Sequence, residues 1–116
     1  MKAFQELGAR VRQFAEERDW AQFHSPKNLS MALSVECAEL MEHFQWLTEN
    51  QSRKLGPKKL REVEKELADI QIYLIRLSQV LGIDLMSAGR KKLGNNARKY
   101  PVSKARGSAK KYTELR

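Results

Sequence analysis

The sequence contains little cysteine, little proline and no long apolar run. Its single cysteine, Cys37, cannot form a disulfide within the chain, and a protein without disulfides suits a reducing compartment. No apolar run approaches the roughly 20 residues that a membrane-spanning helix requires. Residues 1–14 alternate apolar and polar side chains and contain no apolar block typical of a signal peptide. We therefore expect a cytoplasmic location and no membrane partner.

The sequence also lacks the two-residue alternation of apolar and polar side chains that indicates strands. Its 116 residues correspond to one domain, and 41% hydrophobic with 31% charged residues is typical of a folded protein. Apolar side chains recur every three or four positions, which predicts an all-α bundle of four helices. Residues such as Met41, Phe44 and Ile72 have no obvious partner within one chain, so we expect the bundle to assemble as an oligomer.

Proline and glycine mark the expected ends of these helices. The pattern predicts four helices, at residues 2–18, 26–47, 57–81 and 84–99. Ser25 and Asp84 suit N-caps, Pro26 and Pro57 suit the first helical turn, and Gly82 suits a left-handed C-cap. The polar stretch at residues 49–56 is expected to be irregular.

Positive charge is concentrated in the last quarter of the chain. The net charge is +8, yet residues 89–116 contain ten lysines and arginines against Glu114 alone, which gives +9 there and −1 elsewhere. A basic segment suits a polyanion, either nucleic acid or the phosphates of a nucleotide, or it is a solvated tail. We expect residues 1–100 to form a helical domain and residues 101–116 a basic, non-periodic tail that packs on a neighbouring chain.

Two pairs of acids interrupt the apolar faces of the second and third expected helices. Glu36 and Glu39 form one pair, and Glu66 and Asp69 form the other. A turn of about 100° per residue places the first acid of each pair inside the apolar stripe and the second about 60° away. If the stripes face each other, four carboxylates converge, and each like-charged pair about 4 Å apart repels by about 4 kcal/mol. Protons or metal cations must relieve this repulsion.

Carboxylate oxygens are the preferred ligands of hard cations, so the pattern favours Mg²⁺ or Mn²⁺ over Zn²⁺. His43 is the one nearby nitrogen that can join them. A di-iron bundle instead needs a glutamate followed by a histidine three residues later, and neither acid pair has that arrangement. The alternative to a metal site is a solvated helix face on which the acids pair with lysines.

Aromatic and basic side chains near the helix ends suit a nucleotide. Trp20, Phe23 and His24 lie in the first loop, and Trp46 lies at the end of the second expected helix. Such rings stack on bases, or they cover the end of a bundle. Four polar residues of the fourth expected helix suit phosphates or a solvated face: Lys92, Asn96, Arg98 and Lys99.

Together these segments resemble the all-α nucleotide pyrophosphohydrolases of the MazG type, and most closely the dCTP pyrophosphatase branch. The resemblance covers nearly the whole chain. It rests on residues 14–20, 23–28, 36–39, 44–46, 66–69, 72–74, the spacing of Lys92 and Asn96, and residues 100–101 and 111–115. It implies a Mg²⁺-dependent enzyme that cleans the nucleotide pool by hydrolysing a deoxynucleoside triphosphate, dCTP or a modified dCTP, to the monophosphate and pyrophosphate.

The resemblance also implies residue roles and an assembly. Metal ligands would be Glu36, Glu39, Glu66 and Asp69; the base and sugar pocket would be formed by Trp20, His24, Trp46, Tyr73 and Asn96; and Lys92 would reach the phosphates, with Arg98 and Lys99 beside it. Glu36 or Glu39 would take the proton of the attacking water. Family members of this branch are tetramers built as dimers of dimers, with pockets completed by neighbouring chains. His43 departs from the apolar residue usual at its position.

Two other functions stay open. A basic helical module that binds nucleic acid through the last quarter explains the charge but not the acids in the apolar stripes. A purely structural helical oligomer would tolerate glutamine at positions 36 and 66 and would gain no stability from Mg²⁺. The pyrophosphohydrolase is the leading hypothesis, and it implies no stable nucleic-acid partner.

Overall fold

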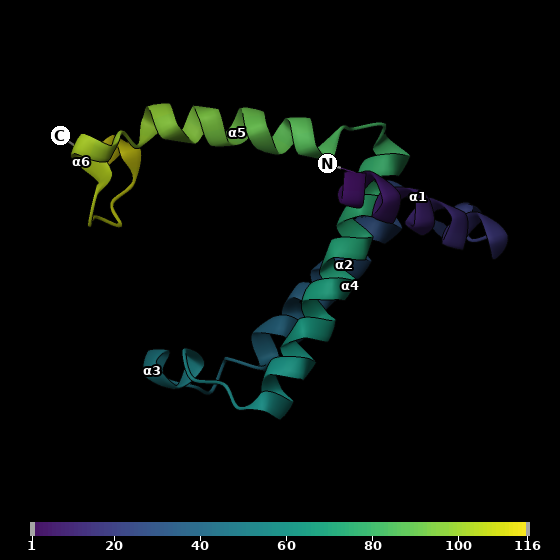
Figure 1. The fold of residues 1–116 in the computed structure, drawn as a ribbon, viewed down its shortest axis with the longest axis horizontal. Coiled ribbons are helices and arrows are strands. Elements are labelled where there is room, and N and C mark those ends of the chain that lie inside the picture. The colour runs from purple at the N-terminus through teal and green to yellow at the C-terminus, as the bar shows by residue number, and fades with distance from the viewer. Residues whose placement is uncertain (1, 116) are drawn as a thin grey trace. The chain divides into compact units, whose positions relative to one another are not determined.

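The computed structural model describes residues 2–115, and within this range it contains helices and no strand. The elements are α1 (Lys2–Glu17), η1 (Ala21–Phe23), α2 (Pro26–Glu42), α3 (Glu49–Ser52), α4 (Pro57–Leu81), α5 (Leu85–Lys99), α6 (Val102–Ala105) and η2 (Tyr112–Glu114), as Figure 1 shows. The all-α fold class and the four long helices are therefore confirmed. Among the described helices, none combines the length and the apolar content of a membrane span.

The predicted helix ends are largely confirmed by hydrogen bonds. The Ser25 side chain accepts a hydrogen bond from the Asn28 backbone N–H and caps α2, and Asp84 caps α5 in the same way. A proline occupies the first turn of both α2 and α4. Gly82 ends α4 with a φ of +67°, a left-handed conformation that glycine adopts without steric cost.

The prediction that the second helix continues through residue 47 is wrong, because α2 ends at Glu42 and residues 43–46 form a turn. The cause lies just beyond. Thr48 and Gln51 form a capping box that starts the single-turn helix α3, and the Thr48 backbone is extended, with ψ of 166°. An extended cap residue cannot continue a helix, so the chain leaves α2 before it. The stretch expected to be irregular thus contains a helical turn.

The chain forms two compact units, one ending at Gly82 and the other starting at Ile83. In the first unit, α4 lies along α2 and α1 packs against α4 (Figure 1). The apolar core of this unit is small, and its buried members are Val11, Ala15, Leu29, Val63 and Ile75. On the same helices Met31, Val35, Met41, Leu60 and Leu67 are each more than half exposed. The long helices therefore present apolar faces that their own unit does not cover.

The second unit contains α5, α6 and η2. Here the last helical turn folds back on the end of α5. The rings of Tyr100 and Tyr112 meet edge to face with centroids 6.1 Å apart, and the Lys99 ammonium lies 4.8 Å from the centre of the Tyr112 ring. The tail thus contains the short elements α6 and η2. Each is a single helical turn, which is too short to produce a periodic pattern in the sequence. Its packing on a neighbouring chain stays a prediction.

Candidate active site

Three of the four predicted metal ligands meet between α2 and α4. One carboxylate oxygen each from Glu36, Glu39 and Glu66 lie within 4.8 Å of one another, and all three residues are partly buried. The fourth acid, Asp69, is exposed and its oxygens lie outside this group. Helical spacing predicts that Glu36, Glu39 and Glu66 come together, but it does not predict that Asp69 stays exposed and outside this group.

The carboxylate cluster, defined as Glu36, Glu39 and Glu66, is electrostatically strained. One oxygen of Glu36 and one of Glu66 are buried and have no hydrogen-bond partner among residues 2–115. Burial, and then the adjacent carboxyl groups of Glu39 and Glu66 together with the charge of Asp69, raise the pKa of Glu36 to about 7. Buried oxygens without partners are costly, and like charges favour a protonated acid. A positive charge placed among these oxygens would relieve the repulsion.

A hard divalent cation fits this donor set. The donor atoms are all carboxylate oxygens, as Mg²⁺ and Mn²⁺ prefer, and among residues 2–115 one oxygen of Glu36 and one of Glu66 have no hydrogen-bond partner. Glu36, Glu39 and Glu66 are the residues able to hold such an ion. Asp69 lies one turn beyond Glu66 on α4 and faces the next feature of the site.

His43, which follows the end of α2, borders the carboxylate cluster. Its Nε2 atom lies 3.8 Å from Glu66 Oε1, and its Nδ1 atom lies 3.8 Å from Glu62 Oε2 and 3.3 Å from Lys59 Nζ. Lys59 Nζ in turn lies 3.4 Å from Glu62 Oε2. The expectation that His43 approaches the acids is confirmed. The positive charge of Lys59 balances part of the negative charge of the acids around His43.

An aromatic cavity of about 260 Å³ lies next to the acids, between α1, the first loop and α4. It is lined by Val11, Phe14, Ala15, Trp20, His24, Leu29, Asp69, Ile72, Tyr73 and Arg76. Three of the predicted pocket residues, Trp20, His24 and Tyr73, therefore meet in one cavity. The Trp20 ring stands edge-on to both Phe14 and His24, with centroids 5.5 Å and 6.3 Å away. A flat ligand ring can enter beside such aromatic walls.

Asp69 connects this cavity to the carboxylate cluster. Its side chain lines the cavity, and its charge contributes to the raised pKa of Glu36. The carboxylate cluster and the aromatic cavity of the first unit are thus neighbours along one face of α4. A ligand that carries an aromatic ring and a polyanion can reach both.

Arg76 is a charged cavity residue that is not among the predicted site residues. It is 8% exposed and forms hydrogen bonds to His24 and Gln79. A signal existed in the sequence, because Arg76 follows Tyr73 by three residues and Asp69 by seven, which places all three on one side of α4. A charged residue at such a position is usually taken for a solvated one.

Other predicted site residues lie outside the cavity. Trp46 occupies the turn after α2 and is 86% exposed. Lys92, Asn96, Arg98 and Lys99 belong to α5 in the second unit. Their spacing places Lys92, Asn96 and Lys99 on one face of that helix and Arg98 on another, where its guanidinium bonds Asn95.

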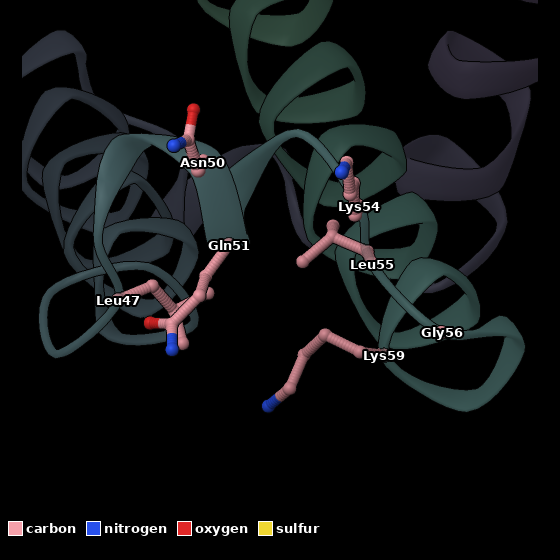
Figure 2. Close-up of a pocket in the computed structure, with 7 residues that line it drawn as sticks. All are labelled: Leu47, Asn50, Gln51, Lys54, Leu55, Gly56 and Lys59. Atoms are coloured by element: carbon pink, nitrogen blue, oxygen red, sulfur yellow. The ribbon is translucent and has the colours of Figure 1, made fainter.

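A second hollow, of about 550 Å³, lies around α3 and the start of α4. Figure 2 shows Leu47 and Gln51 on one side of it and Leu55 and Lys59 on the other. Asn50, Lys54 and Gly56 complete the lining. None of its residues is an acid or an aromatic, so it lacks both features of the site described above.

Comparisons with known proteins agree with this geometry. A model of the MazG-like family matches residues 31–115. The chain is 45% identical to dCTP pyrophosphatase 1 of Homo sapiens and 46% identical to dCTP pyrophosphatase 1 of Mus musculus, over 105 residues in each case. These residues make up 89% of this chain and 62% of each relative, so the chain spans less than two thirds of the length of these relatives.

A solved structure shares the fold. The crystal structure of a pyrophosphatase from Archaeoglobus fulgidus superposes with a TM-score of 0.80 at 39% identity, covering 85% of this chain and 93% of that one. The fold and the site together define an all-helical protein with a carboxylate cluster beside an aromatic cavity. The chain belongs to the MazG-like family. The resemblance to the dCTP pyrophosphatase branch, predicted from the sequence, is confirmed by these identities.

Proposed function

We propose that the protein is a nucleoside triphosphate pyrophosphohydrolase that converts dCTP or a modified dCTP to the monophosphate and pyrophosphate with Mg²⁺, or with Mn²⁺ in its place. The observation that carries the proposal is the position of Asp69. It lines the aromatic cavity, and its charge helps to raise the pKa of Glu36 in the carboxylate cluster. A base in the cavity would leave its triphosphate directed toward the acids. The name shared by the mammalian relatives supports the choice of dCTP.

The residues of the first unit have different roles in the proposed reaction. Glu36, Glu39 and Glu66 would hold the divalent ion, with Asp69 joining them from the cavity side. When bound, the ion neutralises the triphosphate and makes water a better nucleophile. Glu36 would accept the proton of the attacking water through an oxygen that is not used as a metal ligand. Trp20 and Tyr73 would enclose the base, and His24 would hydrogen-bond to it.

The residues outside the cavity require a fuller assembly. Trp46 is too exposed to contact a base within its own unit, so we propose that it completes the pocket of a neighbouring chain. Lys92 and Asn96 share one face of α5 with Lys99, a row suited to phosphate oxygens. The uncovered apolar faces of α2 and α4 support an oligomer, which we propose to be a tetramer built as a dimer of dimers and located in the cytoplasm.

The test is a product analysis. The full chain is incubated with Mg²⁺ and each common nucleoside triphosphate in turn, with a chelator as control, and the products are separated by ion exchange. Monophosphate with pyrophosphate, formed fastest from a cytosine nucleotide, is expected. Diphosphate with phosphate would contradict the bond assigned. No turnover, together with DNA binding that falls steeply with salt, would favour the nucleic-acid module instead.

A further inference from the structure

Arg76 is a buried cation for which the reaction scheme above has no use. Its side chain lines the aromatic cavity, and it forms no ion pair with any residue between 2 and 115. A buried charge without an ionic partner is costly, and it is retained where its hydrogen bonds serve a purpose. The hydrogen bonds of Arg76 indicate its role.

Arg76 is the middle of a hydrogen-bond chain that links α1 to the cavity. The Gln79 amide nitrogen donates to the backbone carbonyl of Gly8 at 2.7 Å. Arg76 Nη1 donates to Gln79 Oε1 at 3.1 Å, and Arg76 Nε donates to His24 Nδ1 at 2.9 Å. This series of hydrogen bonds therefore runs from a backbone oxygen of α1 through two side chains of α4 to the imidazole of His24.

The donors and acceptors in this series of hydrogen bonds can be assigned in only one way. A backbone carbonyl only accepts, so the Gln79 nitrogen must face Gly8 and the Gln79 oxygen must face Arg76. A guanidinium only donates, so His24 Nδ1 must accept and cannot carry a proton. Burial, and then the charge of Arg76, lower the pKa of His24, which keeps the ring neutral. A neutral ring with a free Nδ1 lone pair carries its proton on Nε2.

The Nε2–H group of His24 is available to a ligand. No residue of the described chain forms a hydrogen bond with it, since the one hydrogen bond of the His24 ring is that from Arg76 to Nδ1. Among the described residues, the buried side-chain polar atoms without a partner belong to Glu36 and Glu66, so Nε2 of His24 is not fully buried, and the His24 ring lines the cavity. An unpaired donor on the wall of an aromatic cavity selects for a ligand atom that accepts.

We propose that Arg76 is a positioning residue for base binding. It holds His24 in the Nε2–H tautomer, so that the cavity binds a nucleobase whose edge offers an acceptor, either a carbonyl oxygen or an unprotonated ring nitrogen. The identity of the ligand as a nucleobase rests on the proposed function, whereas the tautomer rests on the hydrogen-bond chain alone. The opposing view is that Arg76 only ties α1 to α4 as a structural strut.

The first arm of the test needs no nucleotide. The chain has two histidines, so a long-range proton–nitrogen correlation spectrum of ¹⁵N-labelled protein contains two ring systems, and His43→Gln identifies the one that belongs to His24. A neutral His24 ring at neutral pH, with its proton on Nε2 and an unprotonated Nδ1, supports the proposal. A proton on Nδ1, or on both nitrogens, would overturn it.

The second arm measures base recognition by calorimetry, using non-hydrolysable deoxynucleotide analogues with Mg²⁺. The pair compared is a cytosine triphosphate analogue and an apolar isostere of it, which has the same shape but weak acceptors. Loss of one hydrogen bond predicts about tenfold weaker binding of the isostere to the wild type. His24→Gln, whose amide nitrogen can replace Nε2–H, should keep this difference, and His24→Asn should lose it.

Arg76→Met removes the donors and keeps the length of the side chain, and it should abolish the tenfold discrimination. Arg76→Lys, which can still donate to Nδ1, should restore part of it and remains informative if the methionine variant does not fold. Arg61→Met changes an exposed arginine of the same helix and serves as the matched control. Unchanged discrimination in a folded Arg76→Met would overturn the proposal. Failure of every nucleotide to bind, with the His24 tautomer intact, would instead overturn the proposed function.

Discussion

His43 Nε2 lies 3.8 Å from Glu66 Oε1, which places an imidazole beside the one carboxylate of α4 that joins the cluster. The ring reaches this position because α2 ends at Glu42 and His43 begins the turn. A neighbour of this kind orients a metal-binding carboxylate, and loss of such neighbours typically weakens metal binding.

Replacement of His43 by leucine should therefore weaken Mn²⁺ binding by roughly tenfold, because Glu66 loses its polar neighbour. Calorimetric titration of the nucleotide-free protein with Mn²⁺ measures the effect. Lys54→Leu, a change of an exposed lysine in the hollow around α3, is the matched control. Equal Mn²⁺ affinity in the His43 variant and the wild type would show that the ring does not influence the cluster.

Glu36→Gln should abolish turnover while leaving the helical content unchanged. The amide removes a negative ligand and the proton acceptor, but it also removes like-charge repulsion from Glu39. The metal-free variant should therefore melt at or above the wild-type temperature, and Mg²⁺ should no longer raise its melting temperature. Circular dichroism with and without Mg²⁺, beside the product assay, measures all three quantities. Full activity in this variant would remove Glu36 from the site.

The stability of the metal-free protein should depend on pH through Glu36. Burial and its acidic neighbours raise its pKa from 4.5 to about 7, so the folded protein binds the proton more readily than the unfolded chain. The contribution to the free energy of unfolding is fully present below the unfolded pKa and is lost as pH rises through the folded pKa. Melting temperatures between about pH 5 and about pH 8 should show this decline, and Glu36→Gln should flatten it. Mg²⁺ should stabilise more at the alkaline end.

Trp46→Ala should weaken nucleotide binding with little effect on the stability of the first unit, because the Trp46 side chain is 86% exposed. Loss of a stacked base predicts a binding penalty of about 1–3 kcal/mol. Calorimetry with a non-hydrolysable analogue gives the affinity, and thermal unfolding gives the stability. A large drop in melting temperature without loss of affinity would assign the ring to an interface instead of to the base.

Leu29→Ala should destabilise the first unit by about 2–5 kcal/mol, since Leu29 is 2% exposed and also lines the aromatic cavity. Chemical denaturation measures the change. Leu60→Ala, at an exposed position of α4, is the control and should have a much smaller effect on a dilute sample. Similar losses for the two variants would mean that Leu60 of α4 is buried in solution to an extent comparable with Leu29 of α2.

Much of the fold follows from local chemistry in the sequence. The caps at Ser25, Asp84 and Gly82 act through their own neighbours in the chain, so the ends that they define are predictable. The end of α2 is not, because the apolar pattern runs on to Leu47 while the cap at Thr48 interrupts the helix. The apolar pattern and the Thr48 cap favour different helix ends there, and the pattern of apolar residues alone does not tell which of the two prevails.

The site is predictable in direction but not in depth. Helical spacing brings Glu36 and Glu66 together, yet it does not reveal that Asp69 lies nearer to the surface and lines the cavity. Arg76 escapes notice because its burial depends on hydrogen bonds to Gln79 and His24, the second of them 52 residues away in the sequence. Contacts of that kind arise only once α1, the first loop and α4 have packed.

The five apolar side chains buried within the first unit are few for helices as long as α2 and α4. We expect the remaining apolar surface of these helices to be covered by association of subunits, so dilution should destabilise the unit. Its unfolding midpoint should then rise with protein concentration, and the proposed activity should be lost at concentrations where the subunits dissociate.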